Sequence, residues 1–488
     1  MRDHGQGRAG GQPAWELLLP AAAAPARRRG RALQEALREA VRTGRLTAGT
    51  RLPSSRDLAG DLGVSRGLVT EAYEQLTAEG YLRSDRGSGT WVGDAARAAA
   101  APEARGPAAR GPAVRVDFRP GTPDLSLFPR SAWSAAHRSV MSRLPHGALG
   151  YPDPRGLPEL RTALAAMLAR RRGVVADPER LVVCSGVAQA STLLGFALRA
   201  RGLRTVGIED PGSPEHGRLF ASTGLDALWL PMDEEGLLPG PLAASGVRAV
   251  VLTPSHQFPS GIAYSADRRA ALLDWARRVD GWIMEDDYDG DFRYDRAPVG
   301  ALQGLDPRRV VYAGSVSKSL APGLRLGWML VPEDMVDEVV ERKRTMDLGN
   351  PALDQALLAE FVARGGYDRQ LRRCQRAYRE RRDALVAALR QELPGTRVSG
   401  IAAGLHVIAR VPGRYGPPGR FLERAAAAGV ALRPLEDYGT ARPADGDVRL
   451  VIGYAHLGPA DIARGVRLVA RACAPSGGGA REPGDPGA

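Results

Sequence analysis

The sequence predicts two domains of different fold class: a small N-terminal unit of helices with a two-stranded ribbon, and a large α/β unit built on a parallel sheet. Three observations support this division. Apolar residues recur at helical spacing up to residue 80. After residue 117, short apolar runs alternate with helical stretches, an order typical of wound parallel sheets. Between the two parts lies a segment rich in Ala, Pro, Gly and Arg, in a chain of 488 residues that is long enough for several cores.

The composition is that of an ordinary globular protein, with 44% hydrophobic and 25% charged residues and no apolar run of membrane-spanning length. The apolar stretch LLLPAAAAP is short and is followed, not preceded, by arginines, so we expect no secretory signal. The three cysteines, Cys184, Cys374 and Cys473, are widely spaced. They argue against disulfides and a metal site, and they predict a reducing cytoplasm.

The charge is unevenly distributed. The chain carries a net charge of +12, and residues 1–115, with 18 Arg, no Lys and 12 acidic residues, account for +6 of it. Such an excess permits nucleic-acid binding without proving it. The chain has only two lysines among its 67 basic residues, Lys318 and Lys343.

Domain boundaries follow from where large apolar side chains are absent. Residues 95–115 and 475–488 carry almost none, so neither segment can bury enough surface to fold. We therefore expect a small domain over 13–94, a flexible linker over 95–115, a large domain over 116–474 and a disordered tail over 475–488. Within the large domain, residues 355–472 are expected to form a smaller α+β part.

Three helices and a hairpin account for the small unit. Ser54 is suited to cap a second helix over 55–62, and Ser65 a third helix that ends at Gly80. YLRS and TWVG flank the turn DRGSG and predict a two-stranded ribbon. Apolar residues at helical spacing mark the first and third helices: Leu33, Leu37 and Val41, then Val69, Ala72, Tyr73 and Leu76.

The second and third helices, joined by a tight turn through Gly63, match the helix-turn-helix pattern. The polar amino end of the third is slim enough to enter the major groove of DNA. On this pattern alone, the alternative is a protein-interaction domain with arginines on its solvated face. The residues expected at the DNA lie on the recognition helix, beside it and at the ribbon tip: Ser65, Arg66, Gly67 and Thr70, then Arg56, then Arg86, Gly87 and Ser88.

A longer stretch carries a resemblance. Residues 44–92 (GRLTAGTRLPSSRDLAGDLGVSRGLVTEAYEQLTAEGYLRSDRGSGTWV) resemble the GntR-type winged helix-turn-helix almost from end to end. The resemblance implies that this unit binds double-stranded DNA and that Arg56, Arg66 and the wing glycines contact it. Thr70 departs from the pattern, because some members carry a second arginine there, so the base preference stays open.

In the large unit, the chemistry-bearing residues fit the needs of pyridoxal phosphate: a lysine amine, an anion at the ring nitrogen, a donor at the ring oxygen and a phosphate cup. SVSKSLAPGLRLG places Lys318 at a strand end with Ser315 and Ser317 beside it and Arg325 following. A surface lysine is the alternative. In a chain that uses arginine almost everywhere, a lone lysine at this place favours the cofactor, whereas Lys343, inside ERKR, is expected to be solvated.

Two further motifs supply the other groups. WIMEDDYDG puts carboxylates directly after an apolar strand; Asp286 is the choice for the ring nitrogen and Tyr288 for the ring oxygen, with Glu285 and Asp287 left open. A surface acidic turn or a metal site is the alternative. CSGVAQAST opens a helix whose backbone amides at Val187, Ala188 and Gln189 could bind phosphate.

The order of CSGVAQA, TPSHQFPSG, EDDYD, SVSKS and LRLG resembles fold-type I aminotransferases over about 350 residues. YPDPRGLPELR, TPSHQFPSG and EDDYDGDFRY are similar to the MocR/GabR subfamily of GntR regulators. The resemblance implies a PLP-dependent aminotransferase fold with a large parallel-sheet domain and a small α+β domain. It also implies a Schiff base at Lys318 and a head-to-tail homodimer.

Three departures from the aminotransferase pattern bear on chemistry. TPSHQFPSG lacks the usual asparagine, so Gln257 or His256 is left to serve the ring oxygen. Ser213 stands where relatives often carry a tyrosine, which leaves His216 as a possible ring neighbour. The carboxylate of an effector could be bound by Arg449 or Arg433; Arg449 is favoured because it begins an apolar strand near the C-terminus, with a salt-bridged surface arginine as the alternative.

The favoured function is a transcription regulator whose operator binding responds to an amine or amino acid that replaces Lys318 on the cofactor. The alternatives are a working aminotransferase with an accessory DNA-binding unit, and a regulator that senses pyridoxal phosphate itself. An intact winged helix and the missing asparagine favour regulation over a physiological enzyme.

Overall fold

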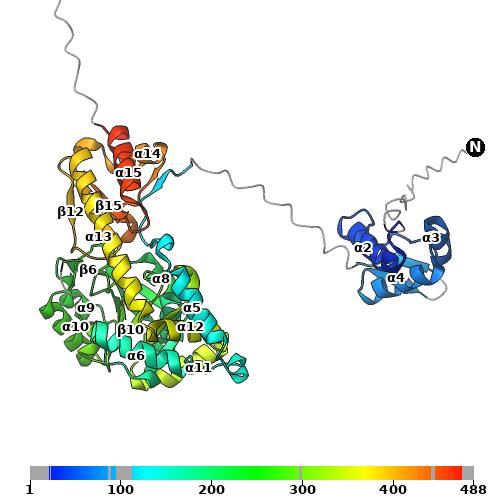
Figure 1. Ribbon diagram of the computed structural model, residues 1–488, viewed down its shortest axis with the longest axis horizontal. Coiled ribbons are helices and arrows are strands. Elements are labelled where there is room, and N and C mark those ends of the chain that lie inside the picture. Colours follow the sequence, from blue (N-terminus) through cyan, green and yellow to red (C-terminus); the bar gives the residue numbers. More distant parts are fainter. Residues whose placement is uncertain are drawn as a thin grey trace, which may run out of the picture. The chain divides into compact units, whose positions relative to one another are not determined.

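A computed structural model describes residues 21, 23–85, 89–94, 113–295, 299–440 and 446–474. The chain divides into two compact units, residues 1–111 and 112–488, which are treated separately (Figure 1). Most of the expected linker, the expected tail and the wing-tip residues Arg86, Gly87 and Ser88 lie outside the described residues.

The first unit is a three-helix domain with a hairpin. It contains η2 (Ala26–Arg28), α2 (Arg29–Arg42), α3 (Ser55–Leu62), α4 (Arg66–Ala78) and the antiparallel strands β1 (Leu82–Asp85) and β2 (Gly89–Val92). The helices begin where the sequence predicts because the hydroxyls of Ser54 and Ser65 accept backbone amides of the first turns, at 3.2 and 3.3 Å. Gly63, with φ +61°, ends α3.

The second unit is built on an eight-stranded sheet, which confirms the predicted α/β class. The strands lie in the spatial order β4 (Leu181–Cys184), β11 (Gly327–Leu330), β10 (Val310–Ser315), β9 (Trp282–Asp286), β8 (Ala249–Leu252), β5 (Thr205–Asp210), β6 (Asp226–Asp233), β7 (Gly236–Leu237). β5, β6, β8, β9 and β10 run parallel, whereas β11 is antiparallel to both of its neighbours and β7 to β6.

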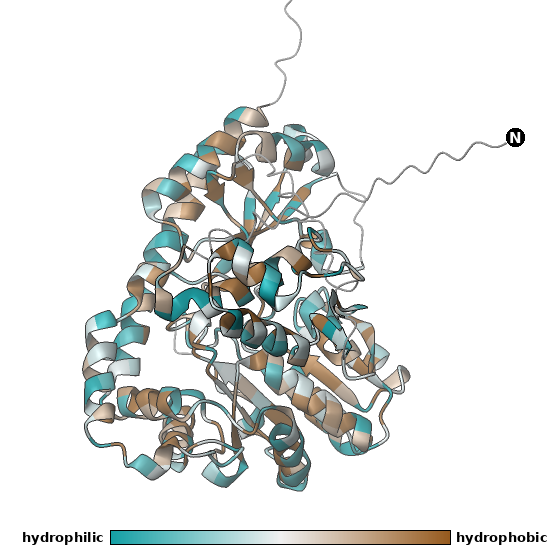
Figure 2. Cartoon of the chain, turned by 90° about the vertical axis from the view of Figure 1, so that its right-hand side faces the viewer, coloured by the Kyte–Doolittle hydropathy of each residue, from teal (hydrophilic) through white to brown (hydrophobic). Residues whose placement is uncertain are grey.

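Helices cover both faces of this sheet, because alternate strand residues enter different cores. Trp282 and Met284 of β9 pack with α7 (Val187–Ala200), α8 (Pro214–Ala221) and α11 (Val336–Asp347). Ile283 packs on the other face with α9 (Pro239–Ala244) and α10 (Ala266–Arg278). That second face also carries α6 (Pro158–Arg172), α12 (Ala352–Ala363) and part of α13 (Gly366–Glu392). In Figure 2 the sheet strands are mostly brown and the helices carry teal on one side, as expected of amphipathic helices around a core.

The long helix α13 leads from the sheet into a smaller part, here called the small subdomain (Figure 1). It comprises the antiparallel strands β12 (Arg397–Ser399), β13 (His406–Val411) and β15 (Val448–Gly453), with α14 (Pro418–Ala427) and α15 (Pro459–Ala472). The predicted start at residue 355 is too early, because α12 packs against α6 and α5 (Arg130–Met141) instead. Short 3₁₀ segments complete the unit: η4 (Leu125–Leu127), η5 (His146–Leu149), η6 (Pro178–Arg180), η7 (Leu302–Gly304), η8 (Pro322–Leu324), η9 (Glu333–Met335), η10 (Gly413–Tyr415) and η11 (Leu435–Tyr438).

The first described residues of this unit join the small subdomain. The amide of Arg115 donates to the carbonyl of Gly429 at 2.7 Å, and β3 (Val116–Asp117) pairs in parallel with β14 (Val430–Ala431). Glycine is required beside this strand: a Cβ at Gly429 would lie 2.9 Å from Arg115, and one at Gly465 would lie 2.6 Å from Phe118. The chain is therefore ordered from Arg115 or earlier, within the predicted linker.

Candidate functional site

The predicted cofactor residues meet at the carboxyl ends of the central strands. β9 and β10 are parallel neighbours with Asp286 opposite Ala313, so the residues that follow each strand lie at one edge of the sheet. Lys318 lies in the turn after β10, and its Nζ donates to the carbonyl of Gly121 at 2.5 Å. Gly121 belongs to the segment that follows β3, so the lysine bridges the sheet and the chain that enters the small subdomain.

Lys318 is half-buried, and burial lowers the pKa of its amine, against the opposing charges of Asp289 and Asp286. A lowered pKa increases the neutral fraction of the amine, which is the form that attacks an aldehyde. Of the two lysines of the chain, Lys318 therefore has the environment that imine chemistry requires.

Asp286 is the carboxylate with an open oxygen. One oxygen, Oδ2, lies 3.0 Å from Nε2 of buried His216, while Oδ1 is buried and makes no hydrogen bond to any described residue. Its neighbours are fully engaged. Asp287 binds Arg172 through two contacts of 2.6 and 3.0 Å, and Glu285 accepts two backbone amides at 2.8 and 3.0 Å. The geometry thus favours Asp286 over both alternatives.

Tyr288 and His256 lie side by side next to this carboxylate. The hydroxyl of Tyr288 is 3.1 Å from Nδ1 of His256, and the two rings stack at 6.1 Å. Gln257 has a different role, because its amide nitrogen donates to the carbonyls of Pro211 and Phe258, at 2.9 and 2.7 Å, and its oxygen accepts from a backbone amide. Its hydrogen-bonding capacity is used within the fold, so the geometry favours Tyr288 at a ring oxygen, with His256 hydrogen-bonded beside it.

The turn between β4 and α7 forms a cup. Gly186 has φ +88°, and a Cβ there would lie 3.1 Å from the guanidinium of Arg325, which also donates to the carbonyl of Ser185. Val187, Ala188 and Gln189 form the first turn of α7, where the amide of Gln189 donates to the carbonyl of Gly186 at 3.2 Å and the amides before it point to this place. The hydroxyl of Ser315 accepts the amide of Ser317 at 3.3 Å at the same sheet edge.

Lys343 corrects the expectation of a solvated lysine, because its side chain is fully buried. Its Nζ donates to Asn350 at 2.7 Å, to Asp347 at 2.9 Å and to Gln189 at 3.3 Å. Gln189 in turn accepts the amide of Ser185 at 2.7 Å. The second lysine is thus a structural support beneath the cup, paired as a buried ammonium must be.

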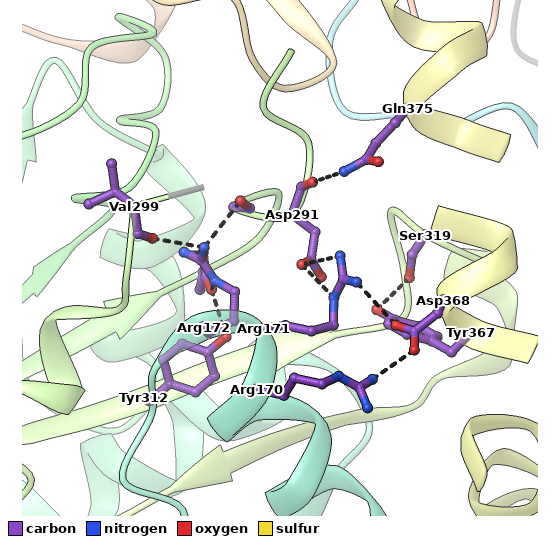
Figure 3. A network of polar contacts seen from close by, with 12 residues as sticks. Arg170, Arg171, Arg172, Asp291, Val299, Tyr312, Ser319, Tyr367, Asp368 and Gln375 are labelled. Carbon is purple, nitrogen blue, oxygen red and sulfur yellow. Dashed lines mark hydrogen bonds and ion pairs between the residues drawn. The ribbon is translucent and has the colours of Figure 1, made fainter. Parts of the chain in front are cut away.

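Of three consecutive arginines at the end of α6, two bind the turn after β9 and the third binds α13 (Figure 3). Arg172 binds Asp287, and Arg171 reaches Asp291 at 3.0 Å and Asp368 of α13 at 3.1 Å. Arg170 binds Asp368 at 2.7 Å. Burial raises the pKa of Asp291, opposed by the nearby guanidinium groups. A small cavity beneath Lys318 is lined by this network, and none of these arginines was predicted because their partners are distant in sequence.

The two arginines considered for an effector carboxylate lie elsewhere. Arg449 pairs with Arg410 across β13 and β15, four residues before Gly453, whose backbone meets the segment leading to Gly121. At 3.3 Å per residue, that separation is about 13 Å along the strand. Arg433 is exposed and lies 3.4 Å from Asp437 in an i, i+4 pair.

The donors present fit pyridoxal phosphate. The ring nitrogen would meet the open oxygen of Asp286, the ring oxygen would meet Tyr288, and the phosphate would lie between Arg325 and the first turn of α7. Because Gly186 has no side chain, the guanidinium of Arg325 can lie against the cup. A guanidinium there suits a phosphate dianion. Among the described residues, no group of His, Cys, Asp and Glu side chains is arranged to hold a metal ion.

In the first unit, most of the expected DNA-contacting residues form one exposed face. Ser65, Arg66 and Gly67 are exposed at the start of α4, and Arg56 is exposed on α3. The hydroxyl of half-buried Thr70 donates back to the carbonyl of Arg66 at 3.0 Å. Sequence reasoning missed a basic cluster on the ribbon: Arg51 and Arg83 each lie over the ring of Trp91 at 5.9 Å.

Comparisons with known proteins agree with both units. Residues 30–92 match the bacterial regulatory proteins of the gntR family, and residues 122–466 match aminotransferase class I and II. The chain is 35% identical to the probable rhizopine catabolism regulatory protein MocR of Rhizobium meliloti, over 89% of this chain and 92% of that protein. It is also 35% identical to the HTH-type pyridoxine biosynthesis transcriptional regulator PdxR of Corynebacterium glutamicum, over 77% and 82%.

Solved structures show the same fold in the second unit. A kynurenine aminotransferase of Pyrococcus horikoshii, crystallised with PMP, superposes with a TM-score of 0.65 at 27% identity and covers 73% of this chain and 90% of its own. LysN, an α-aminoadipate aminotransferase of Thermus thermophilus, gives 0.64 at 28% identity, covering 73% and 92%. None of the helices that the structure describes has both the length and the apolar character of a membrane span.

Proposed function

Since this chain belongs to the MocR-type transcription regulators, in which a GntR DNA-binding domain is joined to an aminotransferase class I and II domain, we propose that it binds pyridoxal phosphate on Lys318 and that a ligand at this site changes its affinity for operator DNA. One observation carries the proposal: a buried carboxylate oxygen of Asp286 makes no hydrogen bond within the described part of the chain, at the same sheet edge as a lysine whose amine pKa is lowered.

Each proposed residue has a distinct task. Bound pyridoxal phosphate supplies an aldehyde that can exchange one amine for another. Lys318 would hold the aldehyde carbon and give it up to an incoming amine, and Asp286 would keep a proton on the ring nitrogen. Tyr288 would donate to the ring oxygen, and Arg325 with the amides of Val187, Ala188 and Gln189 would hold the phosphate.

The effector is either an amine-bearing molecule, such as an amino acid, or the cofactor itself. We propose the cofactor as effector first, because Arg433 lies beside Asp437 and Arg449 lies opposite Arg410 on the neighbouring strand. PdxR, the relative named for regulation of pyridoxine biosynthesis, is in accord with this choice.

We also propose that the chain acts as a head-to-tail homodimer in the cytoplasm, where its operator lies. Large apolar side chains are exposed on adjoining segments of the second unit, with Leu149 60%, Tyr151 89% and Leu348 51% exposed. These segments are neighbours, since Gly349 lies against Pro152. A patch of this kind marks a protein interface more often than a free surface.

Operator binding measured with and without ligand tests the proposal. Wild type, Lys318→Ala and Arg449→Ala are compared on DNA from upstream of the chain's own gene, with pyridoxal phosphate and candidate amino acids added in turn. We expect wild type to respond and Lys318→Ala to lose the response while keeping ligand-free binding. A response to pyridoxal phosphate should survive Arg449→Ala, whereas a response to an amino acid held by Arg449 should not. If Lys318→Ala responds like wild type, the proposed switch is wrong.

Turnover distinguishes the regulator from a working aminotransferase. A physiological enzyme would convert amino donors at rates of about 1 s⁻¹ or more. A regulator responds to ligand at equilibrium without sustained turnover.

A further inference from the structure

A buried acid–base pair lies directly behind Tyr288. Nδ1 of His256 is 2.8 Å from Oδ2 of Asp289, and both side chains are only 3% exposed. The same Nδ1 is 3.1 Å from the hydroxyl of Tyr288. Tyr288, Asp289 and Lys318 line one cavity, so the carboxylate of the pair shares that cavity with the lysine and the tyrosine. Nothing in the tasks assigned above uses His256 or Asp289.

The fold is shaped to hold this pair. A Cβ at Gly404, which has φ +68°, would lie 2.3 Å from His256 and 2.4 Å from Asp289, so only glycine leaves room there. The carbonyl of Gly404 is itself fixed, because the hydroxyls of Tyr294 and Tyr454 both donate to it, at 2.6 and 2.7 Å. The backbone of Gly404 is thus held in the left-handed region directly against His256 and Asp289, which indicates that the position of these two side chains matters.

The two distances settle how one proton is shared. A contact of 2.8 Å between a ring nitrogen and a carboxylate oxygen requires a proton between them. A carboxylate only accepts, so the proton is placed on Nδ1. Nδ1–H then donates to Asp289, with Tyr288 Oη as a second, longer acceptor. The hydroxyl of Tyr288 is itself within hydrogen-bonding reach of Asp289, so His256 and Tyr288 compete for this carboxylate.

We propose that His256 and Asp289 are positioning residues: by donating Nδ1–H to Asp289, His256 competes with Tyr288 for that carboxylate and leaves the hydroxyl hydrogen of Tyr288 available to the ring oxygen of bound cofactor. This inference rests on the proposed function only for the identity of the acceptor. With the amide of Gln257 bound to backbone carbonyls, Tyr288 is the donor that the geometry leaves for this oxygen. The aminotransferase-type asparagine is thus replaced by a relay of three side chains.

Other ionisable groups face the pair and must be counted. Six groups interact with His256 or Asp289 through charge or hydrogen bonds: Asp287, Tyr288, Lys318, His406, Tyr294 and Tyr454. The rings of His406 and His256 lie 5.2 Å apart. Burial lowers the pKa of His406 to about 3, so the His406 ring is neutral near pH 7. His256 therefore has no cationic histidine neighbour near neutral pH.

The protonation state can be measured without cofactor. The chain has only seven histidines, so ¹⁵N-histidine labelling resolves them, and His256→Asn identifies the signal. We expect His256 to be neutral with its proton on Nδ1 in wild type, and to shift to the Nε2–H form in Asp289→Ala. An Nε2–H form in wild type would overturn the proposal.

The loaded protein gives an independent readout, the pH midpoint of the cofactor's visible absorption. In His256→Phe, Tyr288 no longer has a competitor for Asp289 and its hydroxyl stays on that carboxylate, so the ring oxygen loses its donor and the midpoint should rise by about one pH unit. His256→Asn, whose amide can replace Nδ1–H, should return it to within about 0.3 pH unit of wild type. Asp306→Asn, a buried carboxylate bound by Arg277 away from this site, is the matched control.

A midpoint unchanged in His256→Phe would contradict the proposed role. If His256→Phe fails to fold, the labelling experiment on wild type still decides. If wild type shows no visible absorption with added pyridoxal phosphate, the proposed function fails, while the protonation state of His256 is still measured.

Discussion

The guanidinium of Arg172 binds both oxygens of Asp287, at 2.6 and 3.0 Å, one residue beyond the carboxylate assigned to the ring nitrogen. Both side chains are nearly inaccessible, and Tyr312 donates to the same carboxylate at 2.6 Å. α6 is thereby fixed to the turn that follows β9, and the direction in which Asp286 points depends on an arginine 114 positions earlier in the chain.

Arg172→Ala should therefore destabilise the second unit. Removing one partner of a buried ion pair leaves an uncompensated charge, which typically costs about 3–5 kcal/mol. Chemical denaturation followed by tryptophan fluorescence measures the effect. Arg464→Ala, which removes an exposed pair with Asp461, is the control and should change the free energy of unfolding by less than about 0.5 kcal/mol. Equal effects of the two variants would contradict the role given to Arg172.

Borohydride reduction should attach pyridoxal phosphate to Lys318 and leave Lys343 unmodified. The amine of Lys318 has its pKa lowered by burial, whereas Nζ of Lys343 is bound to three side chains and inaccessible. Peptide mass mapping after reduction checks this, and Lys318→Ala should yield no adduct. Label on Lys343 in the native protein would overturn the assignment.

Arg66→Ala should weaken specific DNA binding by about 1–3 kcal/mol if the guanidinium makes a bidentate base contact. Fluorescence anisotropy on operator and scrambled duplexes measures the effect, and affinity should fall steeply with salt for both. Arg31→Ala is the control, because Arg31 is 83% exposed on α2 and pairs with Glu35. Equal binding of operator and scrambled DNA by wild type would show that the unit does not read sequence.

His406 should make the second unit less stable in mild acid. Its folded-state pKa is lowered to about 3 by burial, so below about pH 6.5 the unfolded chain binds a proton that the folded chain does not. Stability should then fall by about 1.4 kcal/mol per pH unit, or about 2 kcal/mol between pH 6.5 and 5. His406→Gln, which retains a donor for the carbonyl of Pro259, should remove that part of the slope in urea unfolding. An unchanged slope would show that His406 is protonated in the folded state.

The elements predictable from sequence are those fixed by local chemistry. α3 and α4 begin at Ser55 and Arg66 because a serine caps each helix, and β9 and β10 were visible as apolar runs ending in polar residues. The sheet order was not predictable, because the antiparallel placement of β11 beside β4 depends on contacts between partners 143 to 149 residues apart, such as Gly327 with Cys184 and Leu330 with Leu181.

The same distinction holds at the candidate site. Lys318, Asp286 and Tyr288 could be selected because they follow strands. The burial of Lys343 could not, because ERKR resembles a solvated helix face and its acceptors, Gln189 and Asn350, come from another helix and a later loop. Likewise, Asp286 could be separated from Asp287 only once Arg172 was seen to bind the latter.

The pairing of β3 with β14 determines where the chain that comes from the DNA-binding unit is attached to the second unit. The polypeptide arriving from that unit is fastened at Arg115 and Val116 to the small subdomain, not to the eight-stranded sheet. The close packing of Gly429 against Arg115 and of Gly465 against Phe118 leaves β3 no room to shift along β14. Any rotation of the small subdomain against the sheet must therefore also move the point at which the chain from the DNA-binding unit is attached. Lys318 is hydrogen-bonded to Gly121, a few residues after that point, and so links the two parts that would rotate.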